Sequence, residues 1–319
     1  LAFAEDRVRE LLSYLEAHAG DFGARTWQEA LAQLQNLHPS VDRYIARYEQ
    51  IWSESRDTAI AADLVTWPDY PIRYVQQPRW AREAAPNLYF LFYRAPATFD
   101  GLTPVEYLAP PIDESLPVEE QRRRLEATND SVIKLNHVVH HGGLGHHVQN
   151  YHAYRAASRI GQIAGVDCAS RIALSCGGTM TEGWACYSTE LMADIGALTP
   201  LESFAEKLSG LRMAMRTIVD IRLHRGEYSL EQAAAQYVER AGMGQDSALA
   251  EAVKNSMFPG NALMYLMGTE TIWSLRRELA ARQPGAFSLR QFHDKFLSYG
   301  SVPVARIAAQ MRSEAAHAQ

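Results

Sequence analysis

Apolar residues recur every three or four positions along most of this chain, which is the spacing of helices that bury one face. Four residues near the amino terminus show the pattern: Val8, Leu11, Leu12 and Leu15. Thr26, followed three positions later by Glu29, is typical of a capping box that starts a second helix, and Ser40 is a candidate cap for a third. We therefore expect residues 1–66 to form an amino-terminal helical segment.

Residues 67–115 break this pattern. Eight prolines exclude long helices from the segment: Pro68, Pro71, Pro78, Pro86, Pro96, Pro104, Pro110 and Pro111. Between them, the aromatic run Tyr89–Tyr93 favours a strand. The sequence predicts an extended insertion that contains a short sheet or a wrapping arm, and not a separate domain.

Helical spacing returns over residues 116–319. Asn129 or Asp130 can cap a helix that continues to His140, and another helix is expected over His146–Ala164. Four more helix boundaries carry recognisable end signals: Gly196 after Thr179–Ile195, Thr199-Pro200 before a helix that reaches His224, Ser229 with Gln232, and Ser288 with Gln291. The predicted fold class is mainly α, a large helical array with a short extended or β insertion, packed as one compact unit.

Composition agrees with an ordinary globular protein, since 47% of the residues are hydrophobic and 21% are charged. The net charge of −6 argues against nucleic acid as a partner. No apolar run reaches the length of about 18–20 residues that spans a bilayer, so no membrane partner is expected. The pattern leaves a homodimer open.

The number and spacing of the cysteines bear on the cellular compartment of the protein. Cys168, Cys176 and Cys186 are odd in number and lack CxxC spacing, so a disulfide framework is not expected. A reducing compartment, the cytoplasm, follows as the expected location. The sequence begins with Leu1, which leaves a preceding segment open.

Six of the eleven histidines fall between His137 and His152, and four of them lie in the segment His140–His147. Neutral imidazole is the commonest ligand of zinc and similar metals. Seven residues along an undistorted helix would separate two imidazoles by about 10 Å, too far to share an ion easily. The glycines at 142, 143 and 145 permit a bulge or break that shortens this gap. Surface or helix-capping histidines are the alternative interpretation.

Glu182 is the candidate third ligand, because it opens a helix in an otherwise apolar stretch. The alternative is an acid of the first helical turn that the helix dipole favours. Cys186, one turn further on, can face the same site or belong to the core.

Five motifs in order resemble the bacterial family known as domain of unknown function 885 (DUF885), which is related to the zincin metallopeptidases. They are the segment His140–His147, Glu182-Gly183-Trp184-Ala185 with Tyr187, Arg216 with Asp220 and His224, Tyr265 with Gly268, and Phe287 through Asp294. The resemblance covers about residues 72–307; the amino-terminal part carries none of these motifs, and typical members are longer than this chain.

The resemblance implies that His140 is a metal ligand, with His146 or His147 as the second and Glu182 as the third. It also implies that His224 and Tyr265 line the substrate side of a zincin-like metal site. In the family the first motif usually reads His-Glu-x-x-Pro-Gly-His-His, and its glutamate polarises metal-bound water. In this sequence His141 occupies that position and Leu144 replaces the proline.

His141 has two chemical interpretations. A neutral imidazole can accept a proton as a general base, or it can become an additional ligand that closes a coordination position. Either role makes ordinary peptide hydrolysis less favourable. We expect a metal-dependent enzyme, most simply with zinc, that acts on a small organic or peptide-like substrate as a lyase, isomerase or atypical hydrolase.

Two alternatives to this function remain. One is a conventional metallopeptidase or amidohydrolase, in which another acid such as Glu190 replaces the missing base. The other is an inactive relative that keeps the metal for a structural or sensing role. Arg216 and Arg290 are candidates for binding a substrate carboxylate, with salt bridges as the alternative use of both.

Overall fold

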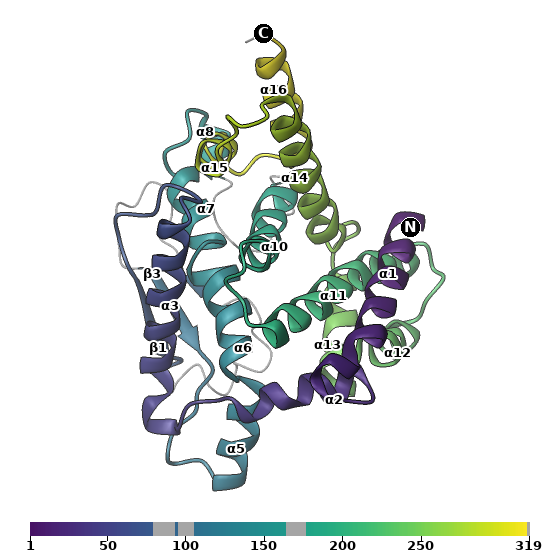
Figure 1. Ribbon diagram of the computed structural model, residues 1–319. Helices are drawn as coiled ribbons and strands as arrows, with labels where there is room; N and C mark the ends of the chain where they lie inside the picture. Colours follow the sequence, from purple (N-terminus) through teal and green to yellow (C-terminus); the bar gives the residue numbers. More distant parts are fainter. Residues whose placement is uncertain (79–92, 95–104, 164–176, 318–319) are drawn as a thin grey trace.

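The structure of the protein is a computed structural model, which describes residues 1–78, 93–94, 105–163 and 177–317. It is mainly helical, as the sequence predicts, with one small sheet (Figure 1). The amino-terminal segment contains three α-helices and three short 3-10 helices: α1 (Ala2–His18), η1 (Ala19–Phe22), α2 (Trp27–Ala32), η2 (Gln33–Asn36), η3 (Val41–Arg43) and α3 (Tyr44–Ala61).

The extended insertion supplies the sheet. Its strands are β1 (Ile72–Gln76), β2 (Tyr93–Arg94) and β3 (Val105–Ala109). Their order is β1-β3-β2, with β1 parallel and β2 antiparallel to β3. Ile72 pairs with Val105, and Tyr93 pairs with Tyr107. Of the strand expected over Tyr89–Tyr93, only Tyr93 lies within the described residues, where it begins β2.

The remaining elements are helices: α5 (Val118–Ala127), α6 (Asp130–Val132), the π-helix η5 (Ile133–Gly142), α7 (His146–Ala153), α8 (Arg159–Ile163), α10 (Gly178–Asp194), α11 (Pro200–His224), α12 (Leu230–Ala241), α13 (Gln245–Ser256), α14 (Leu263–Arg282), α15 (Leu289–Leu297) and α16 (Val304–His317). The helix expected over His146–Ala164 is divided. It ends at Ala153, and α8 begins after Ser158, whose hydroxyl accepts a bond from the Gly161 N–H.

Most of the predicted helix ends are confirmed. Thr199 forms a complete capping box with Glu202 at the start of α11, and Ser229 does so with Gln232 at the start of α12. The side chains of Thr26, Asn129 and Ser288 also cap their helices, whereas the Ser40 side chain makes no capping bond. Local polar spacing therefore sets where these helices begin.

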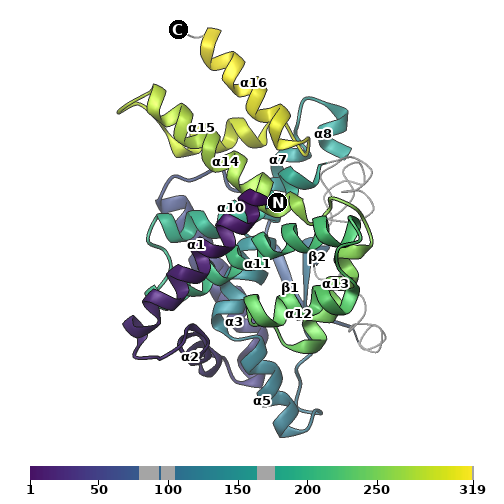
Figure 2. The ribbon, with the colours of Figure 1, turned by 90° about the vertical axis from the view of Figure 1, so that its right-hand side faces the viewer.

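Apolar side chains gather in three main clusters. One joins α1 and α2 to α11, α12 and α13, and it includes Leu15 and Tyr237. A second joins α3, the sheet and η5 through Tyr48 and Val138. The third joins α7 and α10 to the carboxyl-terminal helices through Trp184 and Phe296. Figures 1 and 2 show α3 with the sheet on one side of the molecule and α1 with α11 and α12 on the other.

Helices α10 and α14 cross at unusually short range. A Cβ atom on Gly183 would lie 2.5 Å from the Gly268 Cα atom, and one on Gly268 would lie 2.2 Å from the Thr179 carbonyl oxygen. The Thr269 hydroxyl, next to this contact, bonds to the Gly183 carbonyl oxygen at 3.2 Å. Only glycine permits this approach of two backbones, which places Glu182 of α10 beside Tyr265 of α14.

The carboxyl-terminal helices are attached to the chain near α3 by polar bonds. His293 of α15 donates from Nδ1 to the Leu64 carbonyl oxygen at 2.6 Å, and its Nε2 accepts from the Tyr187 hydroxyl at 2.8 Å. The Asp294 carboxylate accepts bonds from the backbone N–H and the hydroxyl of Thr66. The His293-Asp294 pair therefore holds the fold together.

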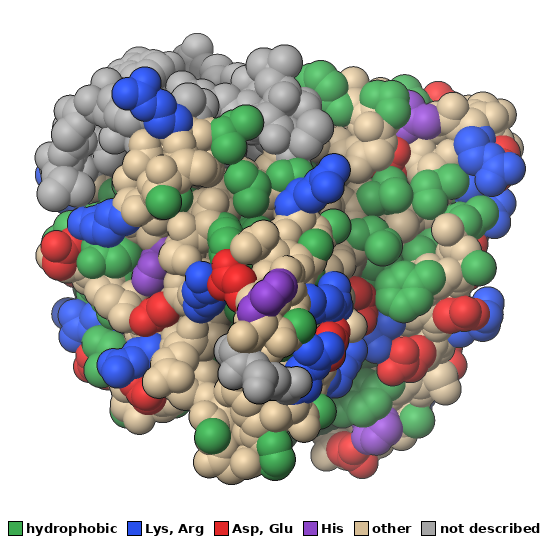
Figure 3. Space-filling view, turned by 90° about the horizontal axis from the view of Figure 1, so that it is seen from above, with side chains coloured by type: hydrophobic (Ala, Val, Ile, Leu, Met, Phe, Trp, Pro, Cys, Tyr) green, Lys and Arg blue, Asp and Glu red, His purple; other side chains and the backbone are tan. Residues whose placement is uncertain are grey.

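The surface of the described residues mixes charges of both signs. In the face seen in Figure 3, acidic and basic side chains are interspersed with scattered hydrophobic ones. On α5, Arg122, Arg123 and Arg124 pair with glutamates three or four positions away. Among the helices that the structure describes, none has the length and apolar composition needed to cross a membrane.

The glycine contact predicts the effect of adding one methyl group. Gly183→Ala is expected to lower the free energy of unfolding by about 1–3 kcal/mol, because the new Cβ overlaps the Gly268 backbone. Gly210→Ala in α11 is the matched control: its Cβ would meet Leu11 Cδ1 at an ordinary 3.5 Å, so stability should be retained or rise by about 0.5–1 kcal/mol. Chemical denaturation of both variants checks this; equal effects would contradict it.

Candidate metal centre

The histidine segment departs from α-helical geometry where the metal site was expected. Residues Ile133–Gly142 form a π-helix, and α7 begins at His146 after a short turn. The Gly145 N–H donates to the Val139 carbonyl oxygen at 2.8 Å. A Cβ atom on Gly145 would lie 1.9 Å from the His140 carbonyl oxygen, so only glycine fits. The turn packs closely against the end of the π-helix and brings His146 next to His140, with ring centres 4.9 Å apart.

Two tryptophans fix this turn to neighbouring helices. The Trp52 indole of α3 donates to the Gly142 carbonyl oxygen at 2.8 Å, and the Trp184 indole of α10 donates to the Leu144 carbonyl oxygen at 2.8 Å. Both indoles are buried, and so are the bonds that they make. Since Trp184 follows Glu182 by two residues, one turn of α10 positions both the indole that holds the turn and the carboxylate.

Four side chains with metal-binding atoms converge at this point. The candidate ligand atoms of His140, His141 and His146 all lie within 4.8 Å of one another. The Glu182 Oε2 atom lies 3.3 Å from His140 Nε2 and 3.8 Å from His146 Nε2. Donor atoms bound tetrahedrally to zinc are separated by about 3.3 Å, given bond lengths of about 2.0–2.1 Å. The Glu182 distances come close to this spacing, and three imidazoles and one carboxylate, half-buried to buried, are ligands that suit a divalent ion in chemistry.

The orientation of the His141 ring is fixed by the backbone. Its Nδ1 donates to the Asn136 carbonyl oxygen at 2.7 Å, which leaves Nε2 as the atom with a free lone pair. A ring N–H held by a carbonyl is the usual support of a metal-binding or proton-accepting histidine. The Tyr107 ring of β3 lies beside it, with the ring centres 5.8 Å apart. The geometry is compatible with either chemical role of His141.

His147 points away from the cluster. Its Nε2 donates to the Tyr70 carbonyl oxygen at 3.2 Å, and burial lowers the pKa of its imidazole to about 4. His137 is likewise engaged elsewhere, since its Nδ1 bonds to the Tyr48 hydroxyl at 2.7 Å and burial lowers its pKa to about 3. Of the two neighbouring histidines that the sequence left open, the structure brings His146 to His140 and Glu182.

The cluster opens into a cleft of about 890 Å³. Its walls come from the sheet, η5 and helices α10 to α14, and His140, His141 and Glu182 line it. Tyr265 of α14 also faces the cleft, and burial, followed by repulsion from Glu182, raises the pKa of its phenol well above the ordinary value. This phenol keeps its proton at neutral pH and can donate a hydrogen bond.

Arg216 lines the same cleft but forms a salt bridge with Glu251. Its Nε and Nη2 atoms donate to the two carboxylate oxygens of Glu251 at 2.7 and 2.9 Å. Its guanidinium carbon lies 4.6 Å from the centre of the Tyr265 ring. The salt bridge that the sequence allowed is therefore present, and Arg216 covers one face of Tyr265.

Two predicted site residues lie elsewhere. The His224 ring donates to Asp220 at 2.9 Å, and Asp220 also accepts from the backbone N–H groups of Gly260 and Ala262. Neither His224 nor Arg290 lines the cleft as far as the described residues define it. The Asp220–His224 pair holds the loop before α14, and Arg290 is an exposed residue 3.3 Å from Asp63.

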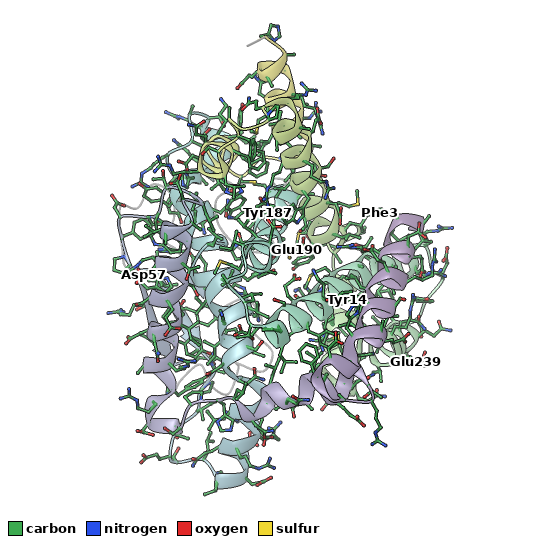
Figure 4. The ribbon with its side chains drawn as sticks, viewed as in Figure 1. Phe3, Tyr14, Asp57, Tyr187, Glu190 and Glu239 are labelled. Carbon is green, nitrogen blue, oxygen red and sulfur yellow. The ribbon has the colours of Figure 1, made fainter. Side chains whose placement is uncertain are left out.

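Glu190, the candidate replacement base, lies two turns beyond Glu182 and faces a different space. With Glu206 and Arg7 it lines a cavity of about 20 Å³, room for about one water. Trp273 donates its indole N–H to the Glu190 carboxylate. Burial, followed by repulsion from Glu206, raises the Glu190 pKa to about 8. Figure 4 shows Tyr187 and Glu190 near the centre of the molecule, whereas Asp57 and Glu239 lie on outer helices.

Sequence reasoning missed the supports of the site. The bonds of Trp52 and Trp184 to the turn could not be predicted from local sequence patterns, because they join residues 90 and 40 positions apart. Glu251 was missed too, since its partner Arg216 lies 35 positions away. The buried thiol of Cys186 packs with Met264 and Tyr265, and Cys168 and Cys176 lie outside the described residues.

Fold and site together define a mainly helical protein with a histidine–carboxylate cluster in a large cleft. The chain belongs to the family described as bacterial protein of unknown function (DUF885), whose model matches residues 1–311. The family assignment made from the motifs is confirmed. The match begins at residue 1, so the amino-terminal helices belong to the family sequence although they carry none of the recognised motifs. No curated protein matches the chain.

Two solved structures share this fold. One is described as a putative lipoprotein of unknown function from Shewanella oneidensis, with a TM-score of 0.77 and 21% identity, and it covers 97% of this chain and 54% of its own. The other is described as a putative lipoprotein from Colwellia psychrerythraea, with a TM-score of 0.78 and 25% identity, and it covers 97% of this chain and 51% of its own. The chain spans about half the length of each. These comparisons give no support to the expected cytoplasmic location.

The raised pKa of Glu190 predicts a pH-dependent stability. The unfolded chain ionises near the ordinary value of 4.5, whereas the folded protein keeps the proton up to about pH 8, so stability falls as pH rises between these values. Glu190→Gln keeps an acceptor for Trp273 but cannot ionise. Relative to wild type, its free energy of unfolding should increase by at least about 1 kcal/mol from pH 5 to pH 8.

Chemical denaturation at several pH values measures this difference. The exposed Glu239→Gln is the matched control and should follow wild type throughout. Parallel pH profiles for wild type and Glu190→Gln would show that Glu190 does not hold its proton in the folded protein.

Proposed function

We propose that this protein is a metal-dependent enzyme that binds one divalent ion, most simply zinc, through His140, His146 and Glu182. The observation that carries the proposal is the convergence of these side chains with His141 in the wall of a cleft of about 890 Å³. A cleft of this size accommodates a small organic or peptide-like substrate. A bound ion would supply Lewis-acid polarisation of a substrate oxygen.

The protein's own residues would supply proton transfer and charge stabilisation. His141, held at Nδ1 by the Asn136 carbonyl oxygen, presents Nε2 toward the cluster and would accept a proton there. Tyr265, whose phenol remains protonated, would donate a hydrogen bond to a substrate oxygen that gains negative charge. Asp220 and His224 would contribute indirectly by holding the loop that precedes α14.

A second candidate function follows from the position of His141. Its ligand atom lies within 4.8 Å of those of His140 and His146, so it can serve as a fourth protein ligand. A centre closed by four protein ligands has no position left for water or substrate, as in structural zinc sites, and such a protein would keep its metal without turnover. In the resembled zincin motif this position holds glutamate. Replacing His141 separates the two candidates.

The metal assignment predicts the composition of the purified protein. Elemental analysis should find about one divalent ion per chain in wild type, and Glu182→Ala should weaken metal affinity by at least about tenfold because it removes a ligand. Glu190→Ala is the matched control on the same helix and should retain the metal. Equal metal content in wild type and Glu182→Ala would remove Glu182 from the site.

The role assigned to His141 predicts a separation of binding from turnover. His141→Ala should retain the metal and lose at least about a hundredfold in kcat on whichever member of a panel of peptides, esters and small acids wild type converts. Loss of the metal from this variant would identify His141 as a ligand and exclude the proton-transfer role. A metal-loaded wild type without turnover, together with an inactive His141→Glu, would establish the structural function.

A further inference from the structure

The cleft wall holds a histidine that the proposed metal centre does not use. His137 of η5 lines the cleft together with His141, one turn further along the same helix, and with Tyr107 of β3. The Tyr107 ring lies beside both histidines, with its centre 5.3 Å from that of His137 and 5.8 Å from that of His141. Because His137 is only 8% exposed, its two ring nitrogens need partners in the protein or in the cleft.

One of these nitrogens has its partner in the protein. Nδ1 of His137 lies 2.7 Å from the Tyr48 hydroxyl, and the two rings stack with their centres 5.6 Å apart. Among the described residues, none makes a hydrogen bond to Nε2 of this ring. Nδ1 faces Tyr48, which belongs to the apolar cluster of α3 and the sheet. The opposite edge of the ring, which carries Nε2, is therefore the edge that lines the cleft.

The Tyr48 hydroxyl fixes which nitrogen of His137 carries the proton. An imidazole nitrogen is a stronger base than a phenol oxygen, so the phenol donates to Nδ1. The distance of 2.7 Å agrees with this direction, since bonds donated by hydroxyls are about 2.7–2.8 Å long and those donated by N–H groups about 2.9–3.0 Å. Burial, followed by repulsion from His141, lowers the pKa of His137 to about 3. A neutral ring that accepts at Nδ1 carries its one proton at Nε2.

The two histidines therefore offer opposite hydrogen-bonding groups. His141 donates from Nδ1 to the Asn136 carbonyl oxygen and presents a lone pair at Nε2. His137 accepts at Nδ1 and presents a proton at Nε2. A molecule whose reacting group lies at His141 thus has an uncharged hydrogen-bond donor one helical turn away, in the same wall of the cleft.

We propose that His137 is a substrate-binding residue that donates its Nε2 proton to a neutral carbonyl oxygen, while the reacting group lies at the candidate metal centre. The substrates are then molecules with an amide or ester carbonyl next to the reacting group, as in peptides and acylated amino acids. A group without an acceptor, such as an ammonium, leaves the Nε2 proton unpaired and loses affinity. The inference rests on the proposed function for the reacting end only, because the donor at His137 does not depend on a metal.

The position of the proton can be observed directly. Long-range ¹H–¹⁵N NMR spectra distinguish the two tautomers of a histidine, and the His137 signals are those lost in His137→Gln. Wild type should show the Nε2–H tautomer between about pH 5 and pH 8. Tyr48→Phe, which removes the donor to Nδ1, should give a mixture of tautomers, whereas Tyr44→Phe, which keeps the Tyr48 hydroxyl, should not. An Nδ1–H tautomer in wild type would overturn the proposal.

Binding of a neutral peptide tests the use of this proton. The probe is N-acetyl-alanyl-alanine methylamide, and its dissociation constant is measured by ligand-observed NMR on the protein as purified. His137→Leu removes the donor and should weaken binding about fivefold. His137→Gln, whose amide can place an N–H group near the position of Nε2, should stay within about twofold of wild type. His317→Leu at the end of α16, outside the cleft, is the matched control and should bind as wild type does.

A double variant guards against an effect of misfolding. His137→Leu leaves the buried Tyr48 hydroxyl without its acceptor, whereas His137→Leu with Tyr48→Phe removes both ends of the bond and should be better tolerated. This double variant should show the same loss of affinity. Equal binding by wild type and the folded double variant, or no binding by wild type up to about 20 mM, would overturn the proposal.

The same measurements separate this inference from the proposed function. A protein that contains no metal and converts nothing, but still binds the peptide through His137, would retain the donor site and lose the enzyme. A metal-dependent enzyme whose peptide affinity does not change in His137→Leu would retain the function and lose this substrate-binding residue.

Discussion

The approach of Gly145 to the His140 carbonyl oxygen is the constraint on which the site depends. A regular α-helix would place His140 and His146 about 9 Å apart along its axis, and their imidazoles would not meet. The π-helix and the turn that follows it remove this separation, because the turn is widened: the Gly145 N–H bonds to the Val139 carbonyl oxygen, six positions earlier. This wide turn is possible only without a side chain at residue 145. Ligand convergence therefore originates in backbone geometry, and the imidazoles follow from it.

Helix α10 relates this turn to the rest of the cleft. Within three consecutive residues it contributes the Glu182 carboxylate, the Gly183 contact with α14 and the Trp184 bond to the turn. The contact at Gly183 brings α14 close enough to α10 for the charge of Glu182 to raise the pKa of Tyr265. Tyr265 in turn lies under Arg216, which is paired with Glu251. Polar side chains from α10, α14, α11 and α13 therefore contact one another in succession, starting from one short stretch of α10. The apolar clusters on either side pack these helices together.

Local signals in the sequence predicted the fold well. The caps at Thr199 and Ser229 and the end of α11 at His224 depend on residues a few positions apart, and spacing reveals them. A grouping of His140 with His146 or His147 was also predictable, from histidine density and the glycine-broken segment, and Glu182 from its place in a helix and from the family resemblance; only the structure shows that His146, and not His147, joins them. Other features depend on distant parts of the chain. The division between α7 and α8, the salt bridge of Arg216 with Glu251, and the bonds that Asp220 accepts from Gly260 and Ala262 all needed the tertiary structure, because no short-range pattern specifies them.

The π-helix has a consequence for how this segment can vary. Each of its turns contains one residue more than an α-helical turn. Deleting a single residue between Ile133 and Gly142 would let one turn relax to α-helical geometry and rotate every side chain on one side of the deletion by about 100° relative to the other. Asn136 would no longer meet His141, and the turn at Gly145 would face another direction. Insertions and deletions, which loops tolerate readily, are thus incompatible with this stretch, and its exact length is as much a determinant of the site as its histidines.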